Sequence, residues 1–153
     1  MAEKIAACGV AVRIDFGDGD GFQTQGLTDS ITPWPRTKTV IDTPDFDCDA
    51  SSSVGREEQS TLVFGQYWDA QDSVHNKVDL NFEDSKTDKD KLEVTVQLVW
   101  PSYKTTGALT SAIVTEEAPC QIASIEPEEL SPEGHFKRNV TLVRTGAITK
   151  TVV

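Results

Sequence analysis

Residues 39–68 read TVIDTPDFDCDASSSVGREEQSTLVFGQYW, so a polar, acidic segment runs directly into an apolar one. Residues 59–68 have the β-branched and aromatic content of a strand. The segment before them, with a proline, four aspartates and three consecutive serines, has too little apolar surface to hold a fixed shape alone. Loop-length statistics favour an ordinary solvated loop for most such segments. The alternative, a long inter-strand loop that a partner orders, depends on the rest of the chain.

Period-two alternation predicts strands in the first half of the chain. Residues 10–16 alternate apolar side chains with polar or small ones, as in a half-buried strand. Residues 17–21, GDGDG, tolerate positive φ and predict a turn, with a hairpin partner over residues 22–27. A further strand is predicted over Ser60–Tyr67.

The strongest strand pattern covers Lys91–Trp100. Its alternating apolar positions are Leu92, Val94, Val96, Leu98 and Trp100. Residues 109–153 alternate short β segments with acidic turns, and two closing strands are predicted around the Thr145-Gly146 turn. The predicted fold class is mainly β, a β-sandwich or barrel-like domain.

One helix is predicted over residues 69–84. Asp69 is the expected N-cap, Asp72 follows three residues later, and acidic groups near a helix start suit its dipole. Apolar side chains recur at every fourth position and would share one face: Val74, Val78 and Phe82. The last two also alternate with Leu80, so periodicity alone leaves a strand open as the alternative.

Length and charge limit the classes of protein that fit. A chain of 153 residues has the size of one domain with a single core, so residues 1–153 are predicted to form one domain. Residues 39–100 hold 14 acidic and 5 basic groups, which is −9 of the net charge of −11. Such a field repels nucleic acid and anionic membranes. Charge that serves only solubility would look the same.

Cysteines and histidines show no pattern of a disulfide framework or a zinc site. Cys8, Cys48 and Cys120 are an odd number without a CxxC pair, so reduced thiols are expected. His75 and His135 are far apart without an HExxH motif, and each is expected at the surface or at a helix edge.

The sequence singles out no catalytic constellation. No GxSxG motif supports a nucleophile, and the aspartates of residues 15–21 have the wrong spacing for a calcium loop, so a hairpin turn is favoured there. No run approaches the roughly 18 apolar residues that span a bilayer. Neither an enzyme, nor a cofactor, nor membrane binding is expected.

The succession of elements resembles the major tail tube protein of long-tailed, non-contractile bacteriophages. The resemblance spans residues 38–150. It rests on these stretches in order: Ile41-Asp42-Thr43, Gly55-Arg56-Glu57-Glu58 leading into Leu62-Val63-Phe64, the helix-like Asp69–Asp84, and Val140-Thr141-Leu142-Val143 with Thr145-Gly146. That family has one helix packed on a β-sandwich, which favours the helix over the strand. Residues 26–38 have no counterpart in the family pattern.

The resemblance implies a structural virion protein of the tail, assembled in the host cytoplasm. In that family six subunits form a ring, rings stack into a hollow tube, and inner strands make a continuous barrel. The implied partners are copies of the same chain together with the tape measure, tail terminator and distal tail proteins. DNA would pass through the lumen without specific binding.

Two sets of residues are predicted to act in this assembly. The resemblance assigns ring-to-ring contacts to the terminal arms and to a loop at approximately residues 43–56, which includes Thr43, Pro44, Asp45, Phe46, Asp47, Asp49, Val54, Gly55 and Arg56. Carboxylates in the lumen would repel phosphate and let DNA slide. The candidate lumen-facing acids are Asp79, Glu83, Asp84, Asp88, Asp90 and Glu93.

Two alternative functions stay open. The tube-forming protein of type VI secretion has the same architecture, and a gene-transfer or pyocin-like tail would use nearly the same subunit. A monomeric carbohydrate-binding β-sandwich would instead use exposed aromatic rings, although aromatics in strands are more often core. Its candidates are Trp34, Tyr67, Trp68, Trp100 and Tyr103.

Overall fold

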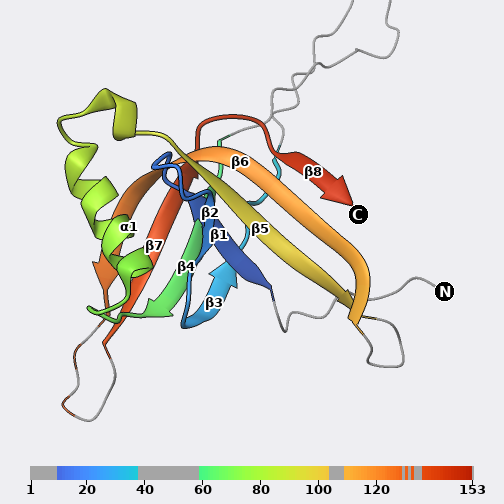
Figure 1. Ribbon diagram of the computed structural model, residues 1–153, viewed down its shortest axis with the longest axis horizontal. Coiled ribbons are helices and arrows are strands. Elements are labelled where there is room, and N and C mark those ends of the chain that lie inside the picture. Colours follow the sequence, from blue (N-terminus) through green and yellow to red (C-terminus); the bar gives the residue numbers. More distant parts are fainter. Residues whose placement is uncertain are drawn as a thin grey trace, which may run out of the picture.

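The computed structural model describes residues 10–37, 59–103, 109–128, 130, 132 and 136–152, and at 101–103 and 109–113 it describes the backbone alone. These residues form eight strands, one α-helix and one 3-10 turn (Figure 1). In chain order they are β1 Ala11–Asp15, β2 Phe22–Thr24, β3 Thr28–Thr32, β4 Thr61–Tyr67, α1 Ser73–Asp84, η1 Lys89–Lys91, β5 Val94–Tyr103, β6 Leu109–Pro127, β7 Lys137–Arg144 and β8 Thr149–Val152. The predicted class, mainly β with one helix, is confirmed.

All strands belong to one antiparallel sheet with the order β2-β1-β5-β6-β7-β4-β3, and β8 also pairs with β6. Strand β6 belongs to two parts of this sheet. Its residues up to Cys120 pair with β5, and from Cys120 onward they pair with β7. Figure 1 shows β6 bending between the two parts. We call β2, β1, β5, β8 and the first part of β6 the long half-sheet, and the rest the short half-sheet.

The core lies between the two half-sheets and α1. The long half-sheet contributes Val12, Ile14, Val94, Val96, Leu98, Ala118 and Cys120, the short one contributes Leu62, Phe64, Ile122, Val140 and Leu142, and Trp34 and Val78 complete the cluster. On the long half-sheet the period-two pattern explains this division, because alternate residues of β1 and β5 face the core and the residues between them face away. Trp34, in the segment that had no family counterpart, is only 5% exposed.

The predicted β1–β2 hairpin is confirmed, although β2 ends at Thr24 rather than at residue 27, and a strand that was not predicted, β3, follows it. Its turn has positive φ at Gly17, Gly19 and Gly21, which glycine adopts without a Cβ penalty. Asp18 and Asp20 in this turn both bind the ammonium group of Lys77 on α1, at 2.7 and 2.6 Å. The two carboxylates therefore share one cation, which offsets one of their two negative charges and joins the turn to α1.

Helix α1 is confirmed, and the strand alternative for these residues is wrong. It begins one turn later than predicted, because Asp72 is the N-cap and its Oδ1 accepts from the Val74 N–H at 2.8 Å. Asp69 lies in the preceding turn, where its backbone N–H donates to His75 Nδ1. Val78 is fully buried and Phe82 packs against the core, as the four-residue spacing predicts.

Three further features of the strands differ from the prediction. Strand β5 starts at Val94, because the Asp88 carboxylate accepts from the Asp90 N–H and starts η1, which leaves Leu92 outside the strand and 37% exposed. Residues 109–127 form one 19-residue strand rather than short segments. Strands β7 and β8 do not pair with each other: they follow one another along the same edge of β6, so the Thr145-Gly146 link does not reverse the chain.

Candidate assembly surfaces

Each side of the long half-sheet ends in a strand whose outer edge has no pairing partner among the described residues. On one side β8 pairs only with β6, and all four of its residues are exposed. On the other side the edge is stepped: β2 is the outermost strand, and β5 continues past Val99, the last residue that pairs with β1. Unpaired N–H and C=O groups at such edges are a template for adding a strand from another chain.

One face of the long half-sheet is polar. The register places Thr24, Arg13, Gln97, Glu117 and Thr149 side by side across five strands. None of these side chains is buried, and the Arg13 guanidinium donates to Gln97 Oε1 at 3.3 Å. The neighbouring rows are mixed. One holds Phe22, Asp15, Thr95 and Pro119, and the other holds Ala11, Val99, Thr115 and Thr151.

Helix α1 and a buried arginine cover the β6 side of the short half-sheet. Arg138 on β7 is 3% exposed. Its Nε donates to Gln66 Oε1 at 2.9 Å, and its two terminal nitrogens donate to Asp79 Oδ1 at 2.6 Å and to the His75 carbonyl at 3.2 Å. A buried guanidinium is stable only when its donors are satisfied, so these bonds fix α1 against the sheet.

His75 is buried, contrary to the prediction of a surface or helix-edge residue. Its ring is 0% exposed. Nδ1 accepts from the Asp69 N–H and Nε2 lies 3.1 Å from the Gly26 carbonyl, so the neutral tautomer with a proton on Nε2 satisfies both nitrogens. This histidine joins the start of α1 to the β2–β3 connection and has a structural role.

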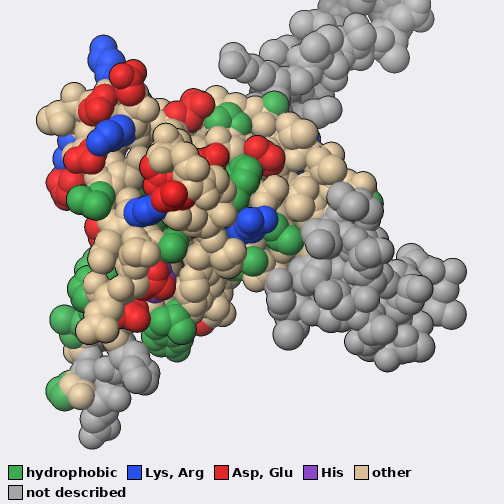
Figure 2. All heavy atoms as spheres, viewed as in Figure 1, with side chains coloured by type: hydrophobic (Ala, Val, Ile, Leu, Met, Phe, Trp, Pro, Cys, Tyr) green, Lys and Arg blue, Asp and Glu red, His purple; other side chains and the backbone are tan. Residues whose placement is uncertain are grey.

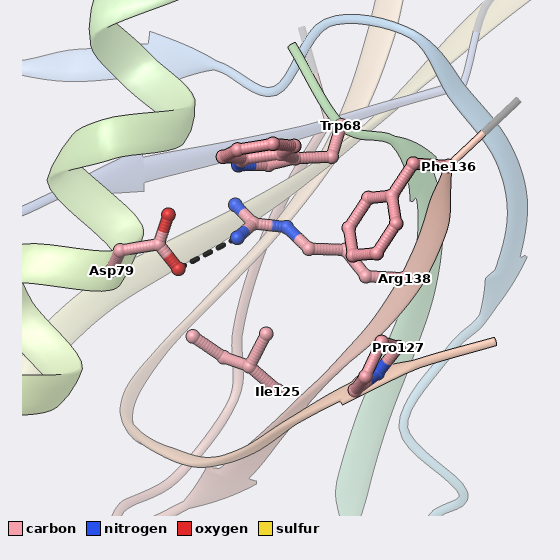
Figure 3. Close-up of a pocket in the computed structure, with 6 residues that line it drawn as sticks. All are labelled: Trp68, Asp79, Ile125, Pro127, Phe136 and Arg138. Atoms are coloured by element: carbon pink, nitrogen blue, oxygen red, sulfur yellow. Dashed lines mark hydrogen bonds and ion pairs between the residues drawn. The ribbon is translucent and has the colours of Figure 1, made fainter. Parts of the chain in front are cut away.

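A pocket of about 320 Å³ opens beside this arginine (Figure 3). Its lining residues are Trp68, Asp79, Ile125, Pro127, Phe136 and Arg138. Trp68 and Phe136 meet edge to face with their centroids 5.3 Å apart. Among the described residues that line the pocket, the two charged ones, Asp79 and Arg138, bind each other.

The six predicted lumen acids gather on α1, on η1 and beside β5, and most of them have partners within the domain. Figure 2 shows acidic side chains mixed with basic ones over α1 and the turn after it. Glu83 binds Lys86 and Asp84 binds Lys91, while Glu93 accepts from the Thr145 hydroxyl. Asp79 binds Arg138 and Asp88 caps η1. Asp90 is exposed. That these six acids face a lumen stays a prediction.

The predicted ring-contact loop, residues 43–56, lies outside the described residues. Within the described ranges, no group of three His, Cys, Asp or Glu side chains is arranged to hold a metal ion, and no helix is long and apolar enough to cross a bilayer. Cys120 is a free, buried thiol whose pKa burial raises to about 12. Among the candidate sugar-binding aromatics, Trp34 is in the core, whereas Tyr67 and Trp68 are partly exposed.

Comparisons with known proteins place this fold among tail tubes. No family model and no curated protein sequence matches the chain. A chain of the sheath–tube complex of an extracellular contractile injection system superposes with a TM-score of 0.67 at 10% identity, covering 98% of this chain and 93% of that one. The C6-symmetric tail of an empty gene transfer agent particle gives 0.62 at 13% identity, with 93% and 95% coverage. The SPP1 tail tube gives 0.65 at 10% identity, with 97% and 79% coverage. The tail tube fold suggested by the sequence resemblance is confirmed.

Proposed function

We propose that this chain is the major tube subunit of a phage-type tail, and that its copies form hexameric rings that stack into a hollow tube for DNA delivery. The observation that carries this proposal is that the described residues leave an unpaired edge on each side of the long half-sheet, in a fold shared with a tail tube. Heterologous contacts between such edges close into a ring when the rotation from one subunit to the next is a whole-number fraction of a full turn. The six-fold symmetry of the similar gene transfer agent tail supports six copies per ring.

The proposed role is structural and needs no cofactor. The tail and sheath–tube structures that share the fold support a structural role. The other proposed partners are the tape measure, the tail terminator and the distal tail proteins. The protein would be assembled in the host cytoplasm and be located in the virion tail.

The loop at residues 43–56 is proposed to make the contacts between stacked rings. Its proline, serine and aspartate content gives it little to bury in a free subunit. Its amide protons should therefore exchange fast in the monomer and slowly in the tube. Equal, fast exchange in both states would remove the loop from the stacking interface.

Assembly of the purified protein tests the function directly. At high protein concentration, or with a nucleating tail-tip complex, electron microscopy should show rings or tubes of one diameter. Addition of EDTA should leave the yield of tubes unchanged. Monomers alone under all these conditions, in size-exclusion chromatography and in micrographs, would contradict the proposal.

A tube of the contractile type is the second candidate, because the sheath–tube complex superposes as well as the tail structures do. The neighbouring genes separate the candidates. A sheath gene beside this one would favour a contractile system, while a tape-measure gene without a sheath gene would favour the non-contractile tail.

A further inference from the structure

The pocket beside α1 combines apolar walls with one exposed carboxylate. Figure 3 shows Asp79 on the α1 side of the pocket and the rings of Phe136 and Pro127 on the other side. Its volume of about 320 Å³ is at the small end of the range for ligand sites, so it suits a single side chain better than a larger molecule. The four apolar side chains that line it are Trp68, Ile125, Pro127 and Phe136.

The exposed carboxylate is that of Asp79. Its Oδ1 accepts from the Arg138 guanidinium at 2.6 Å, and its Oδ2 has no hydrogen-bond partner among the described residues. The Asp79 side chain is 40% exposed, whereas the Arg138 side chain is 4% exposed. Nε and Nη2 of Arg138 donate to Gln66 and to the His75 carbonyl. A molecule that enters the pocket therefore meets the carboxylate rather than the guanidinium.

The charge around the pocket has the same sign as this carboxylate. Residues 69–84, which include α1 and the turn before it, hold five acidic side chains and one lysine, a net charge of −4. That lysine, Lys77, is already bound by Asp18 and Asp20 of the β1–β2 turn. The chain as a whole has a net charge of −11. Such a field attracts basic partners and repels acidic ones.

An alkylammonium group matches both the walls and the charge. The aliphatic stem of a lysine packs against apolar surface while its charged head stays at a polar end. An ammonium group forms a charge-assisted hydrogen bond with a carboxylate and is attracted to aromatic rings. Trp68 is 38% exposed and meets Phe136 edge to face, so a ring surface lies beside the pocket. A purely apolar guest would instead cover Asp79 Oδ2 without giving it a donor.

We propose that this pocket is a docking site for a lysine side chain in a basic segment of a partner protein. The stem lies between the apolar walls, and the ammonium group donates to Asp79 Oδ2. A second copy of this acidic chain is a poor match, because its net charge repels the acids of α1. The site belongs to a single subunit, so the proposal goes beyond the tube function and does not depend on ring formation.

Three small probes test the pocket in the unmodified protein. Nα-acetyl-lysine methylamide carries the stem and the ammonium group, the matching norleucine derivative carries the stem alone, and the glutamate derivative carries the opposite charge. Each is titrated into the unassembled protein, and the Trp68 indole N–H signal is followed by NMR.

The lysine probe should shift the Trp68 signal with a Kd of about 1–10 mM, and added salt should weaken it. The norleucine probe should bind about fivefold more weakly, and the glutamate probe should not bind. Equal affinity for the lysine and norleucine probes, or no shift with the lysine probe, would overturn the proposal. A Trp68 signal that moves with protein concentration alone would show that a second copy fills the pocket, and would overturn it too.

Variants then assign the binding to the pocket. Asp79→Asn removes the charge and keeps an oxygen acceptor for Arg138, and it should weaken the lysine probe about fivefold. Glu126→Gln is the matched control. It removes one charge from β6 at an exposed position between two pocket residues, where the alternation of the strand turns its side chain to the opposite face. Native affinity in Asp79→Asn, or an equal loss in both variants, would overturn the proposal. If Asp79→Asn does not fold, the lysine and norleucine probes decide the question in the native protein.

Discussion

The two ends of strand β6 have different neighbours. From Cys120 to Pro127 it pairs with β7, and α1 packs against it beside the fully bonded Arg138. From Val114 to Glu117 it lies between β5 and the short strand β8, whose outer edge has no partner in the described chain. One end completes its contacts within the domain, and the other leaves backbone groups for a second copy. Strand β6 thus joins the two half-sheets, and the edge proposed for assembly is the outer edge of β8.

Removal of Arg138, which lies beside the end of β6 that pairs with β7, should have the largest effect on stability. Arg138→Ala leaves Gln66 Oε1 and the His75 carbonyl without their donor and removes the partner of Asp79. A buried acceptor left unsatisfied costs about 1–3 kcal/mol, and three hydrogen bonds from a charged group are lost together, so we expect this variant to lose the most free energy of unfolding. Urea unfolding of the monomer measures it. Lys137→Ala, which removes a more exposed cation one residue away, is the control, and an equal loss in both would refute the role of the network.

A methyl group at Gly146 should disturb the end of β6 that pairs with β8. A Cβ there would lie 2.5 Å from Pro119 Cγ, so Gly146→Ala must push the β7–β8 link away from β6. Overpacking of this kind costs about 1–3 kcal/mol. The shift of β8 should also raise the protein concentration that tube formation requires, measured by sedimentation. Gly26→Ala is the control, because its Cβ would approach Asp72 Oδ2 only to 3.8 Å; an unchanged assembly threshold for Gly146→Ala would argue that β8 takes no part.

The Lys77 bridge between the β1–β2 turn and α1 should give a smaller, pH-dependent effect. Its hydrogen bonds to Asp18 and Asp20 raise the pKa of Lys77, and the bond from Lys77 lowers the pKa of Asp18. The stabilisation from Lys77 is present below pH 10.5 and is lost as pH rises through its raised pKa. The stabilisation from Asp18 is present above pH 3.8 and is lost as pH falls through its lowered pKa.

The difference in melting temperature between the native protein and Lys77→Met should therefore persist from about pH 4 to pH 10 and shrink on both sides. Thermal unfolding across this range measures it. Lys86→Met, which removes the partner of exposed Glu83, is the control for loss of a surface lysine. A difference that does not change with pH would show that Lys77 acts through packing alone.

Two surfaces are candidates for the lumen wall: the polar face of the long half-sheet, and the acids of α1 and η1. Lysine substitutions on them should affect stability least, within about 0.5 kcal/mol, but should separate the two surfaces by function. Thr95→Lys and Thr115→Lys should slow DNA ejection from assembled particles, more strongly at low salt, because each adds a phosphate contact to the wall. Glu83→Lys and Asp90→Lys on the opposite side should eject DNA at the normal rate. The reverse pattern would restore the sequence prediction that the acids of α1 and η1 line the lumen.

Local sequence pattern predicted most of the elements but not their pairing. The alternation of β1 and β5 and the four-residue spacing of Val78 and Phe82 are local signals, and the structure confirms them. The length of β6 was missed because Glu116, Glu117 and Pro119 interrupt its apolar pattern, although pairing with strands on both sides holds the backbone extended. The continuation of β7 into β8 depends on their shared partner β6, which no local pattern reports.

The buried polar cluster was also missed, although one signal was present. Arg138 stands at the buried phase of the alternation that Val140 and Leu142 continue, and a charged residue at that phase indicates a buried partner. That partner, Asp79, is 59 residues away on a different element. The burial of His75 likewise depends on Gly26, 49 residues earlier. Only the folded chain brings such pairs together.

A three-dimensional electron cryomicroscopy map of tubes grown from the purified protein would test the central claim most directly. We predict six subunits per ring, a continuous inner barrel in which β8 of each copy pairs with the β2–β1–β5 edge of the next, and α1 on the outside. A tube with α1 against the lumen, or with inner walls not joined through these edges, would contradict the account.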